Sequence, residues 1–448
     1  MTKIAVVGGK LQGLEICYLA MKAGIETVLI DKNPLAPARG LATKFIPFDI
    51  LLLRDEIVRA KGDDKIRQEI YAGEFVNLIE EHEKYDRETG MQGFELIKEL
   101  KKCNLIIPAL ENEEVLKKLV LLCKYKGFNL AFDEEAYKIS SSKLLSDQLF
   151  LNNKLPAPKH FPEGNGPYIA KPIFGSGSKD VIILNDEACV NDFMNSEQGG
   201  DLDQASYIIQ EYMDGPAYSI EVIGSRDKGY KTYQITEIFV DESYDCNRVT
   251  SFTGLSKKQE DEFSSLAINL ANLINLNGIM DVEVILNNGE LKLLEIDARF
   301  PSQTPTAIYA SSGINLLSEL IENFHIKPVE NSLKSADIEN SPSKEMLSHN
   351  DEPDLTEAKR KFSTFEHFLV EDGQLKRLGE HIISEATYIE YLENFMGSDE
   401  ALTDIHENCD NKVFRFTMIN SASTMSELES KRNEMAIKLE ELGRLSDE

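Results

Sequence analysis

The stretch Asp281–Arg299, DVEVILNNGELKLLEIDAR, contains the pattern that decides the fold. Apolar and polar residues alternate on both sides of the Asn-Asn-Gly sequence at 287–289, which is typical of two antiparallel strands joined by a tight turn. In such a hairpin Glu283 lies opposite Glu295, and the strand period of two places Glu295 and Asp297 on one face. The stretch therefore predicts a β-hairpin with three carboxylates on its inner face.

Three carboxylates this close repel one another unless a cation lies between them, and Mg²⁺ prefers oxygen ligands. We therefore expect Glu283, Glu295 and Asp297 to bind metal. Arg299 follows on the same face and offers a planar fork for a phosphate or carboxylate oxygen. The alternative is a solvated hairpin face with ordinary surface charges. Against it, the apolar partners are expected to bury the opposite face, which leaves the charged face without a structural purpose. These partners are Val282, Val284, Leu294 and Ile296.

Upstream of the hairpin, a predicted strand carries Lys171 toward a loop rich in glycine and serine. The loop contains Gly175, Ser176, Gly177 and Ser178. Successive backbone amides in such a loop can point at phosphate oxygens, and the lysine adds a positive charge. Lys143, after three serines at the start of a predicted helix, is a second cationic candidate. An ordinary hairpin turn and an exposed helix lysine are the alternative interpretations.

The segment Ile208–Met213 joins two predicted units. The backbone groups of such a connector can hydrogen-bond the edge of an adenine ring beside apolar side chains, and the candidates are Gln210, Glu211 and Met213. A plain interdomain hinge is the alternative.

The N-terminus reads as strand, glycine loop, helix and strand, which predicts a βαβ unit that opens a parallel sheet. Its glycines are Gly8, Gly9 and Gly13, and this spacing does not match the G-x-G-x-x-G dinucleotide fingerprint. A Rossmann dehydrogenase is therefore excluded. The loop can still bind an anion at the helix N-terminus, with help from Lys10.

The composition limits the partners. The chain has 448 residues, which suggests about three domains, and its net charge of −29 repels nucleic acid and anionic membranes. It shows no signal peptide or membrane-length apolar run, so we expect a cytoplasmic protein. The six scattered cysteines have no zinc-type spacing, and we expect them to be reduced.

We expect a mixed α/β and α+β protein with three units. Residues 1–135 are predicted to form a Rossmann-like domain with a parallel sheet, 136–212 a small α+β lid, and 213–448 a larger domain with an antiparallel sheet. Residues 328–361 are rich in Ser, Asn, Asp, Glu and Pro, and they are predicted to form a polar insertion.

The order and spacing of these motifs resemble the ATP-grasp ligase superfamily. The resemblance implies a three-domain ATP-grasp architecture. Lys143, Lys171 and the loop would hold the nucleotide phosphates, the connector would meet adenine, and the paired carboxylates would bind two Mg²⁺. Two positions differ. Many members carry Asn where Asp297 stands, and an acidic ribose contact where this chain has Ala217.

Within the superfamily the chain resembles the pyrrolysine-biosynthesis ligases, which join 3-methyl-D-ornithine to the side-chain amine of L-lysine. The similar segments include GGKLQG, FDEEAYKIS, SIEVIG, GIMDVE and EIDARFPSQTPT. The resemblance covers most of the chain except about 50–100 and 328–361. It implies that five side chains hold the amino-acid substrates. They are Ser219, Glu221, Asp297, Arg299 and Thr304.

The activity that this resemblance implies is an ATP-dependent ligation through an acyl phosphate. Lys171 and Arg299 would stabilise the developing phosphoryl charge, while Asp297 would accept or orient the proton of the attacking amine. The expected partners are ornithine-type and lysine substrates, with no nucleic acid and no membrane, and a homodimer is left open. The alternatives are an ATP-grasp ligase for other amino acids, a carboxylase-like relative, and an inactive nucleotide-binding relative.

Overall fold

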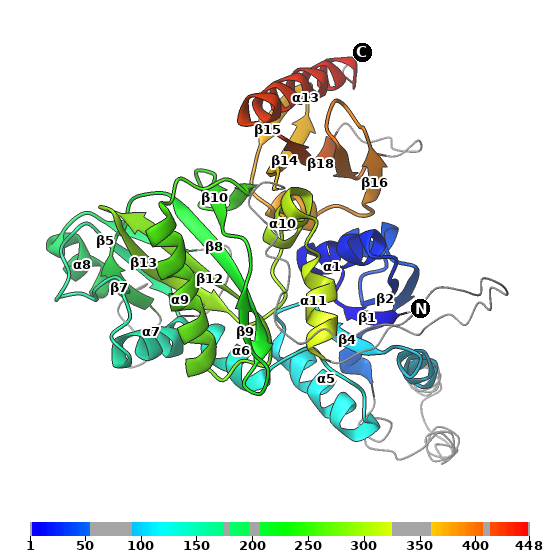
Figure 1. Ribbon diagram of the computed structural model, residues 1–448, viewed down its shortest axis with the longest axis horizontal. Coiled ribbons are helices and arrows are strands. Elements are labelled where there is room, and N and C mark those ends of the chain that lie inside the picture. The colour runs from blue at the N-terminus through cyan, green and yellow to red at the C-terminus, as the bar shows by residue number, and fades with distance from the viewer. Residues whose placement is uncertain are drawn as a thin grey trace, which may run out of the picture.

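The computed structural model describes residues 2–53, 92–173, 180–196, 207–324, 360–405 and 413–446. Within these ranges the chain forms a four-stranded, a three-stranded and an eleven-stranded sheet with helices around them (Figure 1). The expected mixed α/β class is therefore confirmed. The glycine-serine loop Gly175–Ser178 and most of the predicted insertion lie outside the described residues, as do residues 54–91. None of the described helices combines the length and the apolar character needed to cross a membrane.

The N-terminal unit is a parallel sheet with the strand order β3-β2-β1-β4. Its elements are β1 (Lys3–Val7), α1 (Leu11–Lys22), β2 (Glu26–Asp31), η1 (Pro37–Gly40), β3 (Lys44–Pro47), η2 (Ile50–Leu52), β4 (Leu105–Pro108) and α5 (Glu113–Lys126). Strands β1, β2 and β4 are buried on both faces, as their continuous apolar sequences predict, whereas the edge strand β3 is partly exposed. Asn112 caps the start of α5 by accepting a hydrogen bond from the Val115 amide, and Gly127 ends the helix at a φ of 69°. The βαβ prediction is confirmed.

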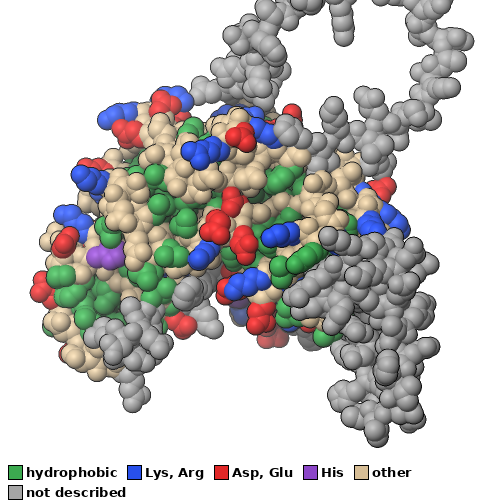
Figure 2. All heavy atoms as spheres, turned by 90° about the horizontal axis from the view of Figure 1, so that it is seen from below, with side chains coloured by type: hydrophobic (Ala, Val, Ile, Leu, Met, Phe, Trp, Pro, Cys, Tyr) green, Lys and Arg blue, Asp and Glu red, His purple; other side chains and the backbone are tan. Residues whose placement is uncertain are grey.

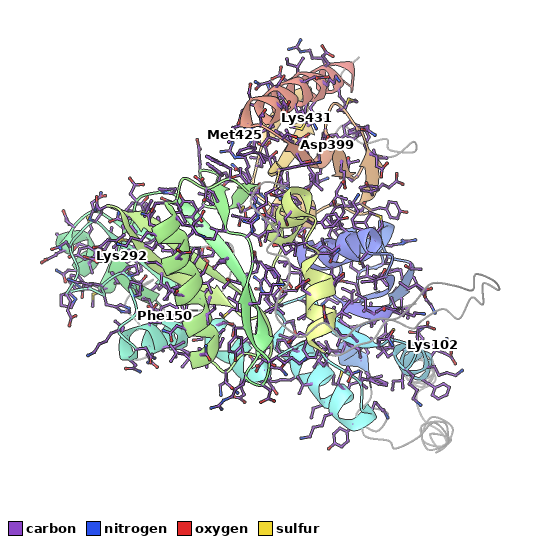
Figure 3. The ribbon with its side chains drawn as sticks, viewed as in Figure 1. Lys102, Phe150, Lys292, Asp399, Met425 and Lys431 are labelled. Atoms are coloured by element: carbon purple, nitrogen blue, oxygen red, sulfur yellow. The ribbon has the colours of Figure 1, made fainter. Side chains whose placement is uncertain are left out.

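The three-stranded sheet is antiparallel with the order β6-β5-β7. The elements of this region are α6 (Glu134–Ser140), α7 (Lys143–Asn152), β5 (Tyr168–Pro172), β6 (Ile182–Leu184), α8 (Glu187–Met194) and β7 (Tyr207–Glu211). The sheet and α8 share a hydrophobic cluster that includes Tyr168 and Phe193. Phe150 of α7 instead belongs to the cluster under the large sheet (Figure 3). The region contains both helices and strands, and its delimitation as one unit over 136–212 stays a prediction.

The large sheet runs β13-β12-β8-β10-β11-β14-β18-β17-β16, with β9 on β8 and β15 on β14. Its strands are β8 (Ala217–Ser225), β9 (Gly229–Thr232), β10 (Thr236–Val240), β11 (Cys246–Thr250), β12 (Gly278–Asn287), β13 (Glu290–Asp297), β14 (Phe362–Glu371), β15 (Gln374–Arg377), β16 (Glu390–Glu393), β17 (Glu400–Thr403) and β18 (Val413–Ala422). Its helices are α9 (Lys257–Leu273), α10 (Thr304–Ser312), α11 (Leu316–Asn323), α12 (His381–Ser384) and α13 (Met425–Ser446). All pairings in this sheet are antiparallel, as predicted.

The β12–β13 hairpin turns through Asn288 and Gly289, whose φ values of 50° and 83° are those of the tight turn that Asn-Gly favours. Glu283 pairs with Glu295, as predicted. One irregularity follows, because Val284 pairs with Leu293 and leaves Leu294 as the extra residue of a bulge. The expectation that Leu294 is a buried partner was therefore wrong. Leu293 is fully buried beneath α9 instead.

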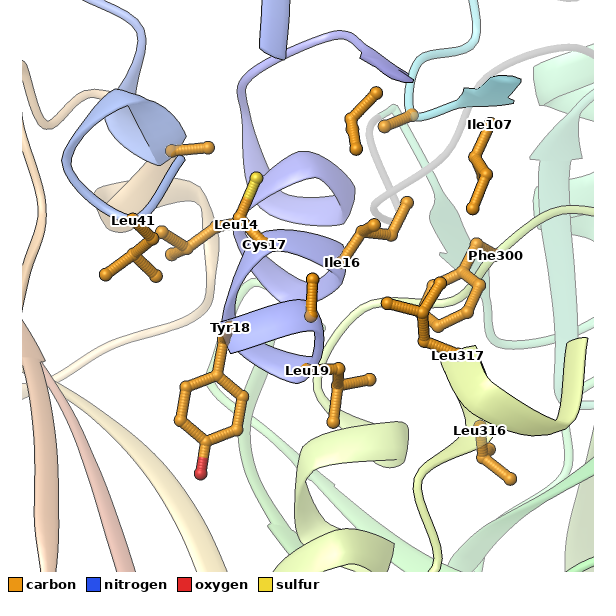
Figure 4. Close-up of a cluster of buried hydrophobic side chains, with 14 of the residues drawn as sticks. Leu14, Ile16, Cys17, Tyr18, Leu19, Leu41, Ile107, Phe300, Leu316 and Leu317 are labelled. Carbon is orange, nitrogen blue, oxygen red and sulfur yellow. The ribbon is translucent and has the colours of Figure 1, made fainter. Parts of the chain in front are cut away.

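Helix α1 connects the N-terminal unit to the rest of the molecule. Leu14, Ile16 and Leu19 of this helix lie in one buried cluster with Phe300 and with Leu317 of α11 (Figure 4). Shared burial of this kind removes apolar surface of both units from water and is the dominant favourable term in their association. The N-terminal sheet is therefore held against the strand end at which the β12–β13 carboxylates lie.

The C-terminal part is tied to the large sheet by a buried ion pair. Glu366 of β14 is fully buried, and both of its oxygens accept hydrogen bonds of 2.7 Å from the Arg432 guanidinium of α13. Arg377 lies 3.3 Å from the same carboxylate. Removing one partner of such a pair leaves a buried charge poorly compensated.

We expect Arg432→Met to destabilise this part by about 3 kcal/mol, because Glu366 loses its bidentate partner. Hydrogen exchange of the β14 and β18 amides measures the loss. Lys438→Gln is the control, since Lys438 forms an exposed helix pair with Glu434 and its removal is expected to cost less than about 0.5 kcal/mol. Equal protection in both variants would contradict the role given to Arg432.

Candidate active site

Two rows of polar side chains cross β8, β12 and β13 on one face of the large sheet. The first row consists of Ser219, Glu283 and Glu295, and the second of Glu221, Asp281 and Asp297. Directly paired residues of antiparallel strands point to the same face, with Cβ atoms about 5 Å apart. The rows lie two residues apart along each strand and so share that face. Figure 2 shows one side of the molecule, where acidic and basic side chains gather around its middle.

The first row combines like charges with a nearby lysine. Burial and the charge of Glu295 raise the pKa of Glu283 to about 8. Lys171, on β5 of the small sheet, has its pKa lowered by burial, while Glu295 and Glu283 act in the opposite direction. The small sheet therefore brings the predicted lysine to the predicted carboxylate pair.

The first row fits the chemistry of a divalent metal site. Glu283 and Glu295 offer hard oxygen ligands side by side, and the charge of Glu295 adds to burial in raising the pKa of Glu283. A bound divalent ion would remove that repulsion and stabilise both carboxylates in their charged form. Glu283 and Glu295, with Asp297 at the edge of the second row, are the residues that would hold Mg²⁺.

The second row holds carboxylates that are more deeply buried. Glu221 is fully buried, and neither of its oxygens has a hydrogen-bond partner among the described residues. Burial raises the pKa of Glu221 to about 7, although the Thr304 hydroxyl lies near enough to oppose that rise. Burial and the charge of Asp297 also raise the pKa of Asp281 well above its usual range. The sequence did not assign a role to Asp281.

Arg299 links the large sheet to the N-terminal unit. Its guanidinium lies 2.7 Å from Asp297 and 2.8 Å from Glu111, which follows β4. Gln12, in the first turn of α1, donates to Glu111 over 3.3 Å. Burial acts to lower the pKa of Arg299, but the charges of Asp297 and Glu111 outweigh it and raise that pKa. Residues of two sheets therefore converge on one arginine.

The start of α10 supplies two more unpartnered hydroxyl groups to this region. Thr304 and Thr306 are buried, and their Oγ1 atoms have no partner within the described part of the chain, nor has the Ser219 hydroxyl. Glu15 of α1 holds this helix start, because the Thr306 amide donates to its Oε1 over 2.6 Å. Ser219, Glu221 and Thr304, all predicted to contact substrate, thus lie around one buried polar region.

Glu15 gives a pH prediction. Burial raises its pKa from 4.5 to about 7, so between these values the folded protein retains a proton that the unfolded chain has released. The free energy of unfolding therefore falls as the pH rises through this window, by at most about 3 kcal/mol, and levels off above pH 7. We expect Glu15→Gln to flatten this dependence in urea titrations followed by circular dichroism at pH 5 and pH 8. Glu114→Gln is the exposed control. An unchanged pH dependence of stability in Glu15→Gln, or a flattened one in the control, would contradict the role given to Glu15.

Lys143 and Lys171, two of the predicted nucleotide contacts, lie at the start of α7 and on β5. The Lys143 amide donates to the Ile173 carbonyl at the end of β5, which places both predicted lysines beside the start of the loop 174–179. The Lys171 pKa is also sensitive to the Lys143 charge. Gly175, Ser176, Gly177 and Ser178 lie outside the described residues, and their role stays a prediction.

The connector side chains have structural partners. Gln210 donates to Asp147 over 2.8 Å, and the Glu211 carboxylate accepts hydrogen bonds from the backbone amides of Lys159 and Asn165. Contact with adenine would therefore fall to the backbone groups of 211–213, including Met213. That role also stays a prediction.

Sequence reasoning missed three residues of this site. Asp281 could have been predicted, because it precedes Glu283 by two positions and therefore lies on the same face of the strand. Glu111 and Gln12 could not have been predicted. Glu111 contacts Arg299, and Gln12 contacts Glu111, only because the N-terminal sheet packs against the large one. Contacts between distant segments have no periodicity from which they can be predicted.

A sheet face lined with carboxylates, opposed by a small sheet with an inward lysine, defines an ATP-grasp carbon–nitrogen ligase. The family model described as ATP-grasp domain matches residues 140–303. The 3-methyl-D-ornithine–L-lysine ligase of Methanosarcina acetivorans is 35% identical over 72% of this chain and 74% of its own length. The chain belongs to the family of these ligases.

Two further proteins are similar. The tyramine–L-glutamate ligase of Methanocaldococcus jannaschii is 26% identical over 72% of this chain and 90% of its own length. The solved structure of the biotin carboxylase of Campylobacter jejuni matches with a TM-score of 0.63 at 12% identity, covering 99% of this chain and 94% of that one. This structural likeness shows the shared fold.

Proposed function

We propose that the protein joins the carboxylate of D-ornithine or its 3-methyl derivative to the ε-amine of L-lysine, with conversion of ATP to ADP and phosphate, in pyrrolysine biosynthesis. The observation that carries the proposal is the second carboxylate row, in which Glu221 and Asp281 are buried side by side and neither oxygen of Glu221 has a hydrogen-bond partner among the described residues. Substrates with several ammonium groups supply such partners. The names of the relatives at 33–35% identity support the same substrates.

The chemistry that these residues support is phosphoryl transfer followed by amide formation. The substrate carboxylate attacks the γ-phosphorus of ATP, ADP leaves, and an acyl phosphate forms. The lysine amine then attacks the acyl carbon, and phosphate leaves with the amide bond formed. Mg²⁺ held by Glu283 and Glu295 would neutralise charge on the phosphoryl oxygens.

The chain's own side chains orient the reactants and shield them. Lys171 and Arg299 lie near the carboxylate rows and would contact phosphoryl or carboxylate oxygens. Asp297, whose pKa burial raises to about 7 despite Arg299, is suited to accept or orient a proton of the lysine ammonium. The packing of the N-terminal unit around Glu111 would limit the access of water to the acyl phosphate.

The second candidate is a ligase for other amino acids. The similarity to the tyramine–L-glutamate ligase favours it, because the two sequences align over 72% of this chain at 26% identity. A glutamate substrate brings an additional carboxylate, however, and a face that already holds an excess of buried carboxylates would repel it.

The direct test is to incubate the protein with ATP, Mg²⁺ and D-ornithine, with and without L-lysine, and to measure ADP and the mass of the amide. We expect an ornithyl-lysine product, and ADP in proportion to it, when both amino acids are present. No ADP under either condition would overturn the proposal. Amide formation with a different pair in an amino-acid panel would favour the second candidate.

A further inference from the structure

Three arginines gather on the face of the large sheet that is opposite to the carboxylate rows. They are Arg248 of β11, Arg377 of β15 and Arg432 of α13. Arg248 pairs directly with Phe239 of β10. Glu237, two residues before Phe239, pairs with Tyr218. Tyr218 precedes Ser219 of the first row and therefore points to the other face of the sheet. The arginine cluster is thus separate from the candidate active site.

The three arginines differ in how their charges are compensated. Both oxygens of Glu366 accept hydrogen bonds from Arg432, and Arg377 lies 3.3 Å from the same carboxylate. Arg432 also donates to Glu429 over 2.7 Å. In the described part of the chain, the Arg248 guanidinium forms no ion pair or hydrogen bond, and its Nε is buried without an acceptor. Glu366 pairs with Arg248 across the strands, but Arg432 already engages both of its oxygens.

The centre of the cluster holds more positive than negative charge. Three guanidinium groups face two carboxylates, those of Glu366 and Glu429. Burial and the charges of the other two arginines lower the pKa of Arg248, while the charge of Glu366 opposes them. Glu237 is a third carboxylate on this face, but it forms no ion pair with Arg248 in the residues that the structure describes, and burial raises its own pKa. The positive charge of Arg248 is therefore left without a direct counter-charge.

Arg248 and Arg377 are neighbours along one strand edge. Strand β18 pairs with β14 over its whole length, so β11 and β15 both lie along the opposite edge of β14. Arg248 pairs with Glu366, and Arg377 pairs with Phe368, two residues further along and on the same face. Two residues span about 7 Å of a strand. One small anion can therefore contact both guanidinium groups.

Arg248 is held in place in a way that leaves its donors available. Its guanidinium lies 3.6 Å from the centre of the Phe239 ring. Stacking at this distance engages the flat face of the guanidinium and leaves the N–H groups at its edge for oxygen acceptors. Thr364 adds a hydroxyl group, since it is 2% exposed and its Oγ1 has no partner among the described residues. Thr364 pairs with Thr250, two residues past Arg248, which is within reach of a long side chain.

We propose that Arg248 and Arg377 form a binding site for a phosphate group, apart from the active site. The planar N–H fork of arginine matches the oxygens of a phosphate, and two such forks can hold one group from two sides. A bound phosphate would supply the counter-charge that Arg248 lacks and leave the ion pair of Arg432 with Glu366 intact. Free phosphate and the phosphate monoester of a small metabolite share this chemistry, because both present at least three terminal oxygens.

The test is calorimetric titration of the full chain with potassium phosphate, in the presence of saturating Mg²⁺ and a non-hydrolysable ATP analogue. The analogue occupies the phosphate positions of the candidate active site, so the remaining binding reports the arginine cluster. We expect saturable binding of phosphate, and none of chloride at the same ionic strength. Arg248→Gln should weaken phosphate binding at least 10-fold, because a charge-assisted hydrogen bond is lost. Titration with ribose 5-phosphate identifies the source, since tighter binding than that of free phosphate indicates a monoester.

Arg377→Gln is a second variant with the same expected direction, and Arg226→Gln, in the exposed turn between β8 and β9, is the matched control that should bind as the wild type does. Without phosphate, Arg248→Gln should melt at the same temperature as the wild type or higher, because a cation that its neighbours repel is removed. No phosphate binding by the wild type, or equal binding by the wild type and Arg248→Gln, would overturn the site. Equal binding together with a lowered melting temperature would assign Arg248 a structural role instead. Acetate that binds as tightly as phosphate would overturn the assignment of the ligand.

Discussion

Glu295→Gln is expected to lower kcat by about 10³-fold, since it removes a metal ligand and the electrostatic stabilisation of phosphoryl transfer that depends on it. The same change should raise the melting temperature of the protein without ligands. Glu283 and Glu295 face each other across the hairpin, and their repulsion contributes to the raised pKa of Glu283. Steady-state ADP release and thermal unfolding measure the two effects.

Glu290→Gln is the control for this change. It makes the same substitution on the same strand, but Glu290 is 73% exposed and pairs only with Lys292 among the described residues. Its rate and melting temperature should equal those of the wild type. A Glu295→Gln enzyme with full activity, or one that loses activity only by unfolding, would contradict the metal role.

Arg299 gives the second large effect. Arg299→Met is expected to lower kcat/KM about 10³-fold, and Arg299→Lys about 10²-fold, because lysine keeps the charge but loses the planar fork. The Arg299 guanidinium also lies between the carboxylates of Asp297 and Glu111. In the methionine variant no cation separates these two carboxylates. The methionine variant should therefore also weaken the contact between the N-terminal unit and the large sheet, which limited proteolysis can detect.

The control for charge alone is Arg226→Lys, since Arg226 is exposed in the turn between β8 and β9. It should leave both kinetics and proteolysis unchanged. If Arg299→Lys were as active as the wild type, the fork geometry would have no role, and the arginine would act only as a positive charge.

The hairpin and its carboxylates were predictable because the pattern is local. Alternation and the Asn-Gly turn place Glu283 opposite Glu295, and this is what the register shows. The bulge at Leu294 was not predictable. Leu293 and Leu294 are equally apolar, so composition does not indicate which one is buried, and the choice is made by packing against α9.

The parts of the site that depend on the approach of distant segments were also beyond sequence reasoning. Glu15 accepts a hydrogen bond from the start of α10, 291 residues away in the chain. This contact forms only because α1 packs on that helix, so it could not be predicted from the sequence. Glu111 reaches Arg299 in the same way. Asp281 is the exception, because its spacing from Glu283 was readable from the strand period.

The transfer of carboxylate oxygen to phosphate tests the central claim most directly. D-Ornithine labelled with ¹⁸O in its carboxylate is incubated with the enzyme, ATP, Mg²⁺ and L-lysine, and the released phosphate is analysed by mass spectrometry. An acyl phosphate at these carboxylate rows predicts one ¹⁸O atom in phosphate for each amide formed. Label in AMP, or amide formation with unlabelled phosphate, would contradict the account.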